Sequence, residues 1–345
     1  MIVAMQATTR QTESLSTGAP GQTRYQILER LLDGHFHSGE VLAAACGISR
    51  AAIWKHIQTL RSYGLDIFSV TGRGYRLAES FEPLDEAFLR ARLLRESGGP
   101  LQVLDLYPVT GSTNRRLLER LKSGAIHAQA CLAEYQQAGR GRRGRGWLSP
   151  YGAGLCLSLG WHFPRAPESL TGLGLVVGLV VMQVLEAVGL EGAGLKWPND
   201  ILWQGCKLGG VLLELQGQAD GPVDVVIGLG LNIQLPVAMR EQIDQPCADL
   251  TQALGQTPPR NELAVDLLQW LVPTLERFSR HGFAGFRALW PRYDLLRDRA
   301  VRLSSPAGVF DGMARGVDDT GALIIGMDGR QRRFLSGDVS VRICL

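Results

Sequence analysis

Four arginines alternate with four glycines in the stretch Gly139-Arg140-Gly141-Arg142-Arg143-Gly144-Arg145-Gly146, here named the glycine–arginine loop. The stretch follows a strand-like run, residues 130–137. Glycine lets the backbone approach a ligand closely, and arginine offers a planar, charged fork for carboxylates and phosphates. The stretch therefore predicts a loop that closes over an anion. A solvated basic loop or an RNA-binding tail is the alternative that this stretch alone leaves open.

The same glycines also match G-x-G-x-x-G, the pattern of dinucleotide-binding folds. That pattern requires a helix that begins at the glycines and an acidic residue about 20 residues later. Here the chain continues as Trp147-Leu148-Ser149-Pro150-Tyr151-Gly152, in which proline and glycine interrupt any helix. The sequence therefore excludes a dinucleotide-binding helix at this loop.

The 345 residues, 45% of them hydrophobic, can bury a sizeable core and suggest two or three domains. The 36 lysines and arginines nearly balance 33 acidic residues, so charge alone does not indicate a nucleic-acid partner. The cysteines lie far apart, without C-x-x-C or histidine at metal-ligand spacing: Cys46, Cys131, Cys156, Cys206, Cys247 and Cys344. They predict free thiols in a reducing cytosol and no metal site.

No signal peptide is apparent, because the apolar run at the N-terminus is too short. The apolar residues 170–185 contain three glycines and fall short of the roughly 20 residues that a bilayer requires. We expect a buried helix there, no membrane association, and a cytoplasmic protein.

The N-terminal part predicts a disordered extension, residues 1–22, and then a winged helix-turn-helix domain, residues 23–80. Apolar residues at helical spacing mark three helices that end near Gly34, Gly47 and Gly64. Thr71-Gly72-Arg73-Gly74 then joins two short strands into a basic wing. A small helical packing module is the alternative, but donors on the third helix favour DNA binding. The residues predicted to contact DNA are Ser49, Arg50, Trp54, Lys55, Gln58, Arg61 and Arg73.

Residues 84–292 predict a second domain, in which strands and helices alternate. Thr110-Gly111-Ser112-Thr113-Asn114 stands at a strand-to-helix turn, where small polar residues either cap the helix or form a ligand corner. Lys196 ends an apolar strand, and a desolvated lysine needs an anionic partner. An exposed lysine whose stem lies along apolar surface is the alternative.

Glycines interrupt the strands that follow Lys196. Residues 201–203 and 207–215 predict a hairpin in which Gly209 and Gly210 leave room for backbone or ligand. Gly228 and Gly230 interrupt the predicted strand 223–233, which indicates that a group lies flat against the sheet there.

The C-terminal part changes from helix to strands. Residues 261–290 predict one helix, because apolar residues recur on one side. From Arg299 onward, short strands separated by turns at 318–321 and 328–329 predict a small β-barrel, residues 295–345.

Three stretches together resemble the biotin–protein ligase family. They are residues 134–145, Lys196-Trp197-Pro198-Asn199-Asp200 with Lys207-Leu208-Gly209-Gly210, and Gly228-Leu229-Gly230-Leu231-Asn232. Phe36-His37-Ser38-Gly39-Glu40 and Ser49-Arg50-Ala51-Ala52-Ile53 resemble the bifunctional members, which also repress the biotin operon. The resemblance implies an α+β multidomain fold: the winged helix-turn-helix, a mixed β-sheet with helices like that of class II synthetases, and an SH3-like barrel.

The resemblance also implies roles for individual residues. Arg142 and Lys196 are expected to be catalytic. The biotin-binding residues are expected to be Ser112, Thr113, Asn114, Gln136, Arg140, Gly141, Arg142, Lys196, Gly209, Gly228 and Gly230. The residues for ATP and the adenylate are expected to be Arg142, Arg143, Arg145, Trp147, Lys196, Asn199, Lys207 and Asn232. Trp54 departs from the bifunctional pattern, where a small polar residue can stand, so the operator sequence is left open.

The expected reaction joins biotin and ATP, with Mg²⁺, into biotinyl-5′-AMP and passes biotin to a lysine of an acceptor protein. The expected partners are the biotin carboxyl carrier protein of acetyl-CoA carboxylase, operator DNA of biotin synthesis genes, and a second copy of the chain in a dimer favoured by biotinyl-AMP. Two alternatives stay open: a ligase whose N-terminal domain does not bind an operator, and a biotin-sensing repressor without catalysis.

Overall fold

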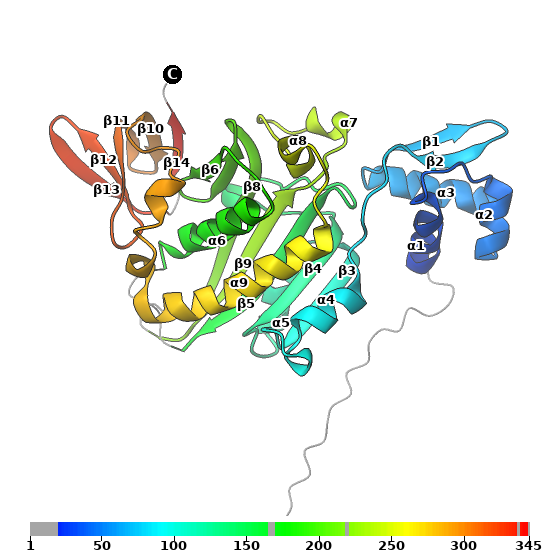
Figure 1. Ribbon diagram of the computed structural model, residues 1–345, viewed down its shortest axis with the longest axis horizontal. Coiled ribbons are helices and arrows are strands. Elements are labelled where there is room, and N and C mark those ends of the chain that lie inside the picture. Colours follow the sequence, from blue (N-terminus) through cyan, green and yellow to red (C-terminus); the bar gives the residue numbers. More distant parts are fainter. Residues whose placement is uncertain (1–19, 165–169, 218–220, 337–338, 344–345) are drawn as a thin grey trace, which may run out of the picture. The chain divides into compact units, whose positions relative to one another are not determined.

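The structure, a computed structural model, describes residues 20–164, 170–217, 221–336 and 339–343. The chain divides into two compact units, Met1–Phe81 and Glu82–Leu345, and each is described by itself (Figure 1). The predicted extension lies outside the described residues as far as residue 19. Its predicted end at residue 22 is too late, because the first helix begins at Pro20.

The first unit is the predicted winged helix-turn-helix. Its elements are α1 Pro20–Leu31, α2 Gly39–Cys46, α3 Arg50–Ser62, β1 Ile67–Val70 and β2 Gly74–Leu77. Ile53, Ile57 and Leu60 recur every three or four residues of α3 and are buried, together with Ile27 of α1 and Leu42 of α2. The three helices thus share one core.

Local hydrogen bonds fix the ends of these elements. The Ser38 and Ser49 hydroxyls accept from the backbone N–H groups of Val41 and Ala52, at 3.1 and 3.2 Å, and so cap α2 and α3. The antiparallel wing, β1 with β2, lies against the segment before α2. Gly74 makes this approach possible, because its φ is +100° and a Cβ there would lie 2.0 Å from the His37 carbonyl oxygen.

The second unit contains a seven-stranded mixed sheet with the order β3-β4-β5-β9-β8-β7-β6. The strands are β3 Val103–Thr110, β4 Gln129–Gln136, β5 Gly154–Phe163, β6 Ala193–Lys196, β7 Asp200–Trp203, β8 Cys206–Gly217 and β9 Val223–Asn232. Only β3 and β4 are parallel among these neighbours; the other pairs are antiparallel. The predicted mixed sheet and its β7–β8 hairpin are confirmed.

Helices cover both faces of this sheet (Figure 1). The helices described in this unit are α4 Glu86–Leu93, α5 Thr113–Leu121, α6 Leu173–Ala187, α7 Val237–Arg240, α8 Leu250–Leu254 and α9 Arg260–His281. Leu117 of α5 packs with Cys131 and Val226, whereas their strand neighbours Leu132 and Val225 join the core of α6 and α9. Because successive side chains of a strand alternate between faces, α5 lies on the face opposite α6 and α9.

The apolar run 170–185 is the buried helix α6, as predicted. Gly178 brings it close to β6, because a Cβ there would lie 3.1 Å from the Leu195 side chain. In the described part of the chain we find no helix with the length and apolar character of a membrane span.

The helix predicted for residues 261–290 is too long. The helix α9 ends at His281, and Gly282, with φ +55°, stops it. Two single 3₁₀ turns, Phe283–Gly285 and Trp290–Arg292, follow. The buried rings of Phe283 and Trp290 continue the apolar pattern past the end of the helix, which explains the wrong boundary.

The C-terminal strands form an antiparallel sheet with the order β13-β12-β11-β10-β14, the expected small β-domain. They are β10 Ala300–Ser305, β11 Gly308–Val317, β12 Leu323–Met327, β13 Arg330–Phe334 and β14 Ser340–Ile343. The turn before β12 meets the rest of the unit, since the Trp197 indole N–H donates to the Gly321 carbonyl at 3.0 Å. Gly321 has φ +83°, and a Cβ there would lie 2.7 Å from Gly172 Cα.

Arg260, the first residue of α9, is fully buried among acceptors. Its Nη2 donates to Glu134 Oε2 and to the Gly154 carbonyl, each at 2.8 Å, and its Nη1 donates to the Glu82 carbonyl at 2.6 Å. The other oxygen of Glu134 accepts from the Leu84 N–H at 2.6 Å. Arg260 therefore joins the first residues of the unit to the end of β4 and the start of β5.

Replacing Arg260 with leucine is expected to lower the melting temperature by several degrees. Glu134 would remain as a buried carboxylate without its cation, a defect that costs about 3–5 kcal/mol. Scanning calorimetry measures the change. Glu134→Gln added to Arg260→Leu should recover part of the loss, whereas Arg280→Leu, at an exposed position of the same helix, should have almost no effect. Equal melting temperatures for wild type and Arg260→Leu would contradict this assignment.

Candidate functional site

Strands β5, β8 and β9 present one face on which small residues lie side by side. In the register, Gly210 of β8 is opposite Gly230, and Ser158 of β5 is opposite Gly228. Gly209 is opposite Leu231 and therefore belongs to the other face. A Cβ on Gly209 would lie 2.5 Å from the Leu231 side chain, within the core. Gly209, which was expected to bind biotin, therefore does not line the cavity, and Gly210 is the residue of the pair that does.

Two side chains lie flat against the glycines of β9, as the strand glycines suggested. A Cβ on Gly228 would lie 2.3 Å from Asn114 Oδ1, and a Cβ on Gly230 would lie 2.6 Å from the Trp147 ring. The protein's own Asn114 and Trp147 therefore occupy the space that these glycines leave.

The N-terminus of α5 meets the end of β4. Ser112 takes the N-cap position without a capping hydrogen bond from its side chain. Instead, Gln136 Oε1 accepts from the Thr113 backbone N–H at 2.8 Å. Ser112, Thr113 and Asn114 are almost fully buried. The predicted ligand corner thus forms together with Gln136, and its polar side chains face one another.

Ser158 and Glu214, which the sequence did not single out, extend this corner. Ser158 Oγ lies 2.7 Å from Thr113 Oγ1 and 2.6 Å from Asn114 Oδ1. Asn114 Nδ2 donates to Glu214 Oε2 at 2.8 Å, and Glu214 Oε1 forms an ion pair with Arg140 Nη1 at 2.8 Å. We name this series the polar row: Gln136, Thr113, Ser158, Asn114, Glu214 and Arg140.

The glycine–arginine loop is folded as a small hairpin. The Trp147 N–H donates to the Gly139 carbonyl at 2.9 Å, and the Gly141 N–H donates to the Arg145 carbonyl at 2.8 Å. Arg143 and Gly144 turn the chain at its tip, with φ of 58° and 74°. Glycine carries such an angle without strain, and the same angle is uncommon for arginine.

Arg142 connects this loop to two other parts of the unit. Its Nη1 donates to Asn199 Oδ1 at 2.9 Å, and its Nη2 donates to the Ser336 carbonyl at 2.6 Å. Asn199 is itself held, because its Nδ2 donates to the Val211 carbonyl at 3.0 Å. The C-terminal β-domain thus helps to hold a predicted catalytic arginine.

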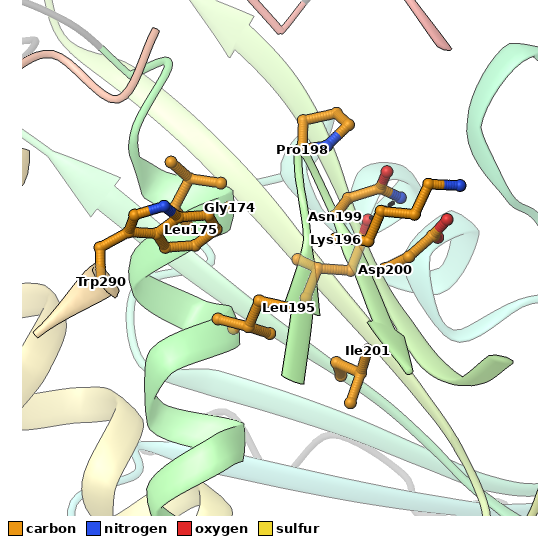
Figure 2. Close-up of a pocket in the computed structure, with 11 residues that line it drawn as sticks. Gly174, Leu175, Leu195, Lys196, Pro198, Asn199, Asp200, Ile201 and Trp290 are labelled. Carbon is orange, nitrogen blue, oxygen red and sulfur yellow. Dashed lines mark hydrogen bonds between the residues drawn. The ribbon is translucent and has the colours of Figure 1, made fainter. Parts of the chain in front are cut away.

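Lys196, the other predicted catalytic residue, ends β6 beside an apolar pocket. Figure 2 shows its side chain extending away from Leu195 and Trp290, on the side where Asp200 lies. Burial is the main cause that lowers the pKa of Lys196, and the Asp200 carboxylate acts in the opposite direction. Asp200 pairs with Lys207, whose Nζ is 2.7 Å from Asp200 Oδ1.

Other positive groups act on Lys196 as well. Lys207, Arg342 and Arg145 each lower its pKa further, because a second positive charge disfavours the first. This part of the cavity therefore holds an excess of positive charge around one carboxylate, which suits a phosphate or carboxylate ligand.

One cavity of about 1080 Å³ is lined by most of these groups; Ser158 and Glu214 do not line it but contact residues that do. The cavity exceeds the roughly 300–1,000 Å³ typical of a pocket for one drug-sized ligand, so two ligands can be accommodated. The predicted residues that line it are Ser112, Thr113, Asn114, Gln136, Arg140, Gly141, Arg142, Arg143, Arg145, Trp147, Lys196, Asn199, Lys207, Gly228, Gly230 and Asn232. Asn232 contributes its oxygen at most, because its Nδ2 donates to the Lys207 and Ala248 carbonyls at 3.3 and 3.0 Å.

Two further segments line the cavity, residues 242–247 and 339–342, and sequence reasoning missed both. Neither has a glycine-rich or charged pattern, and β14 reaches the cavity only through the folding of the β-domain. In the described part of the chain, no cluster of three or more His, Cys, Asp or Glu side chains is suited to a metal ion.

In the N-terminal unit, Arg50, Lys55 and Arg73 are exposed, and Gln58 is half-buried. Trp54 is 55% exposed, so it does not pack inside the unit. Arg61 differs from the prediction: its Nε and Nη2 both donate to the Ile67 carbonyl, at 3.1 and 2.6 Å. It holds the wing to α3, which leaves little of its guanidinium for a phosphate.

The three parts of the chain match known families. A profile of the biotin/lipoate A/B protein ligase family matches residues 106–232, an HTH domain profile matches residues 23–76, and a biotin protein ligase C terminal domain profile matches residues 298–342. Over 319 residues the chain is 42% identical to the bifunctional ligase/repressor BirA of Salmonella typhimurium, covering 92% of this chain and 96% of that protein. The chain belongs to the biotin protein ligase family.

Other members agree with this assignment. The ligase is 38% identical over 264 residues to the biotin–[acetyl-CoA-carboxylase] ligase of Mycobacterium tuberculosis, covering 74% of this chain and 95% of that one. The biotin protein ligase of Aquifex aeolicus, solved in complex with biotin and ATP, superposes with a TM-score of 0.62 at 29% identity, covering 71% of this chain and all of that one. The N-terminal helix-turn-helix matches the bifunctional ligase/repressors.

Adding a methyl group at Gly230 is expected to displace the Trp147 indole, because the new Cβ would lie 2.6 Å from its ring. Fluorine NMR of 5-fluorotryptophan-labelled protein measures this, with Trp147→Phe used to assign the resonance. Gly124→Ala, where a Cβ meets nothing within 4 Å, is the control and should leave the resonance in place. An unshifted Trp147 resonance in Gly230→Ala would show that the ring is not held against β9.

Proposed function

We propose that the ligase joins biotin and ATP into biotinyl-5′-AMP and then transfers biotin to a specific lysine of the biotin carboxyl carrier protein of acetyl-CoA carboxylase. The cavity supports this best: the polar row lies at one end, and an excess of positive charge lies at the other. Biotin carries a hydrogen-bonding ureido ring at one end and a carboxylate at the other. Its carboxylate would therefore lie where the phosphates of ATP bind.

The first step brings two anions together. A carboxylate oxygen of biotin attacks the α-phosphorus of ATP, the bond to the β-phosphate breaks, and pyrophosphate leaves. Arg142 and Lys196 can neutralise the repulsion between the reactants and the charge that develops in the transition state. MgATP is the substrate, with Mg²⁺ held mainly by phosphate oxygens and water.

The polar residues divide between the two substrates in this proposal. Ser112, Thr113, Asn114 and Gln136 hold the ureido ring, and the loop residues Arg140 and Gly141 cover it. The flat Trp147 ring, which lies against Gly230, offers a surface for the nucleotide. The remaining nucleotide contacts are assigned to Arg143, Arg145, Asn199, Lys207 and Asn232.

The second step needs protection from water, because the adenylate is a mixed anhydride. The glycine–arginine loop lines the cavity and can exclude water from it. The acceptor lysine amine then attacks the biotinyl carbonyl carbon, the bond to AMP breaks, and AMP leaves with the electron pair. The acceptor assignment is supported by the name of the Mycobacterium tuberculosis relative. Use of ATP and of this acceptor fits a cytoplasmic protein.

Lys196→Ala is expected to slow biotin-dependent exchange of pyrophosphate into ATP at least tenfold, roughly 1.4 kcal/mol of lost transition-state stabilisation. Preformed biotinyl-AMP should restore much of the transfer to acceptor protein. Lys122→Ala, at an exposed position, is the control. If Lys196→Ala exchanges pyrophosphate at the wild-type rate, Lys196 has no role in adenylation. If the wild-type protein shows no exchange, the chain is a biotin sensor without catalysis.

The pH dependence tests the same residue. Burial lowers the pKa of Lys196, so the free enzyme should lose this proton at a lower pH than an ordinary lysine would. The value of kcat/KM for exchange should fall as pH rises through that range, because the neutral amine no longer attracts the anions. Lys196→Arg stays charged, so its activity, although lower, should lack this alkaline fall. An identical alkaline fall in Lys196→Arg would assign it to another group.

We further propose that the N-terminal unit binds operator DNA of biotin synthesis genes, with biotinyl-AMP as corepressor. The exposed donors Arg50, Lys55 and Arg73 support this, and Gln58 and Trp54 lie on the same helix as two of them. The Ser49 hydroxyl caps α3, so any DNA contact would use its remaining proton. The alternative is a ligase whose N-terminal unit does not bind operator DNA.

Lys55→Ala and Arg73→Ala should each reduce the slope of log affinity against log salt by about one, as the loss of one phosphate contact requires. Fluorescence anisotropy with promoter DNA measures the slope. Arg61→Ala is the contrasting variant, because the Arg61 guanidinium donates to the Ile67 carbonyl. The substitution should loosen the attachment of the wing to α3 but leave the salt slope nearly unchanged. Salt-independent binding by the wild type would contradict the proposal.

A homodimer favoured by biotinyl-AMP would explain how the corepressor acts, since helix-turn-helix proteins commonly read two half-sites as dimers. The edge strand β3 of the seven-stranded sheet offers backbone groups for a second copy, whereas β6 is already bonded through Leu195 to the Tyr293 carbonyl and the Leu295 N–H. Biotinyl-AMP must then bind the dimer more tightly than the monomer. Sedimentation velocity with and without biotinyl-AMP tests this, and an unchanged monomer–dimer constant would exclude it.

A further inference from the structure

Glu214 is an acidic side chain that does not itself line the cavity but contacts two residues that do, Asn114 and Arg140. It lies in β8, opposite Val226, and its strand position puts it on the same face as Gly210 and Leu212. Its side chain is only 19% exposed. A carboxylate in this position needs partners, and it has two.

The two oxygens of Glu214 serve different partners. Oε2 accepts from Asn114 Nδ2, and Oε1 pairs with Arg140 Nη1, each at 2.8 Å. Asn114 belongs to α5, whereas Arg140 belongs to the glycine–arginine loop. One carboxylate thus connects the fixed floor of the cavity to the loop that lines its other side.

Counting the protons available in the polar row shows which group donates and which accepts in each hydrogen bond. Ser158 has one hydroxyl proton but lies within hydrogen-bond distance of both Thr113 Oγ1 and Asn114 Oδ1. The Thr113 hydroxyl donates to Gln136 Oε1 at 3.2 Å, so Ser158 is the donor in both of its contacts and shares its one proton between Thr113 Oγ1 and Asn114 Oδ1. The Asn114 oxygen is then an acceptor, so its NH₂ group faces Glu214. Glu214 must accept from both sides, and an ionised carboxylate does so without a proton of its own.

We propose that Glu214 is a positioning residue for biotin: it orients the Asn114 amide and, through the same carboxylate, holds Arg140 so that the glycine–arginine loop closes over the ureido end. The proposal rests on the function given above, which places the ureido ring at Asn114. It has a specific consequence, because the adenylate phosphates and the nucleotide are assigned to the other end of the cavity. Loss of Glu214 should weaken biotin binding and leave ATP binding unchanged.

Glu214→Gln is the informative substitution, because it keeps the size and shape of the side chain. Its amide oxygen can still accept from Asn114, but its NH₂ group would then face the Arg140 guanidinium, and both are donors. In biotin-dependent pyrophosphate exchange, the KM for biotin should rise about tenfold, and the KM for ATP should stay within about twofold of wild type. Glu276→Gln, at an exposed position of α9, is the matched control.

Arg140→Ala tests the pair from the side of the loop. Because both substitutions break one interaction, the double variant Glu214→Gln/Arg140→Ala should raise the KM for biotin little more than either single variant. A merely structural role for Glu214 would instead lower the melting temperature and change both KM values alike. That result, additive effects in the double variant, or a wild-type KM for biotin in Glu214→Gln would overturn the proposal.

A second measurement does not depend on catalysis. Trypsin cleaves after the loop arginines, so the rate of cleavage within residues 139–146 reports how firmly the loop is held. In the ligand-free protein, Glu214→Gln should be cleaved in this loop faster than wild type and Glu276→Gln. Equal cleavage rates would overturn the loop contact. A wild type without biotin-dependent exchange, but with this difference in cleavage, would mean that the proposed function fails and the loop contact stands.

Discussion

The site depends on one constraint, the buried ion pair of Arg260 with Glu134. Arg260 also donates to the backbone carbonyls of Glu82 and Gly154. Arg260 holds β4 at Glu134 and β5 at Gly154, and the whole glycine–arginine loop lies between these two points. The loop therefore starts and ends on fixed positions, although glycines make its interior easy to bend. A loop of this composition can change shape over a ligand without moving the sheet from which it extends.

The same arginine holds the first residues of the second unit through the Glu82 carbonyl, and Glu134 holds the Leu84 N–H. The point at which the N-terminal unit is tethered is thus bonded to the strand that carries Gln136. The same buried hydrogen bonds therefore hold both the strand that leads to the ligand cavity and the segment that follows the helix-turn-helix unit. Buried charges are costly unless paired; Nη1 and Nη2 of this guanidinium have acceptors, whereas its buried Nε has no hydrogen-bond partner among the residues that the structure describes.

Much of this architecture could be predicted from the sequence, because it rests on local patterns. Glycine stops and apolar spacing marked the three helices of the first unit, and strand glycines indicated that flat groups lie against β9. Local patterns fail where three-dimensional neighbours decide. Gly209 and Gly210 look alike in sequence. Only the register of β8 against β9 shows that Gly209 faces the core and Gly210 faces the cavity. Arg61 and Arg50 look alike on α3, and only the position of the wing shows that Arg61 donates to backbone.

Sequence analysis missed Glu214 for the same reason. An acidic residue in a strand is usually a solvated side chain, and only the fold shows its partners on α5 and in the loop. The end of α9 was wrong because buried rings beyond Gly282 continue the apolar spacing. The cavity residues of β14 are a further case, because no sequence signal links them to Lys196, more than a hundred residues earlier in the chain.

The meeting of Trp197 with the turn before β12 has a consequence for domain exchange between relatives. The indole of Trp197 is bonded to the Gly321 carbonyl, and Gly321 fits only because its missing Cβ leaves room for Gly172. Trp197 is also the residue directly after Lys196. A chimera that takes its C-terminal domain from another ligase must therefore bring a glycine to this turn. Any other residue would place a Cβ 2.7 Å from Gly172 Cα, so the turn would have to shift away from the residue next to the lysine.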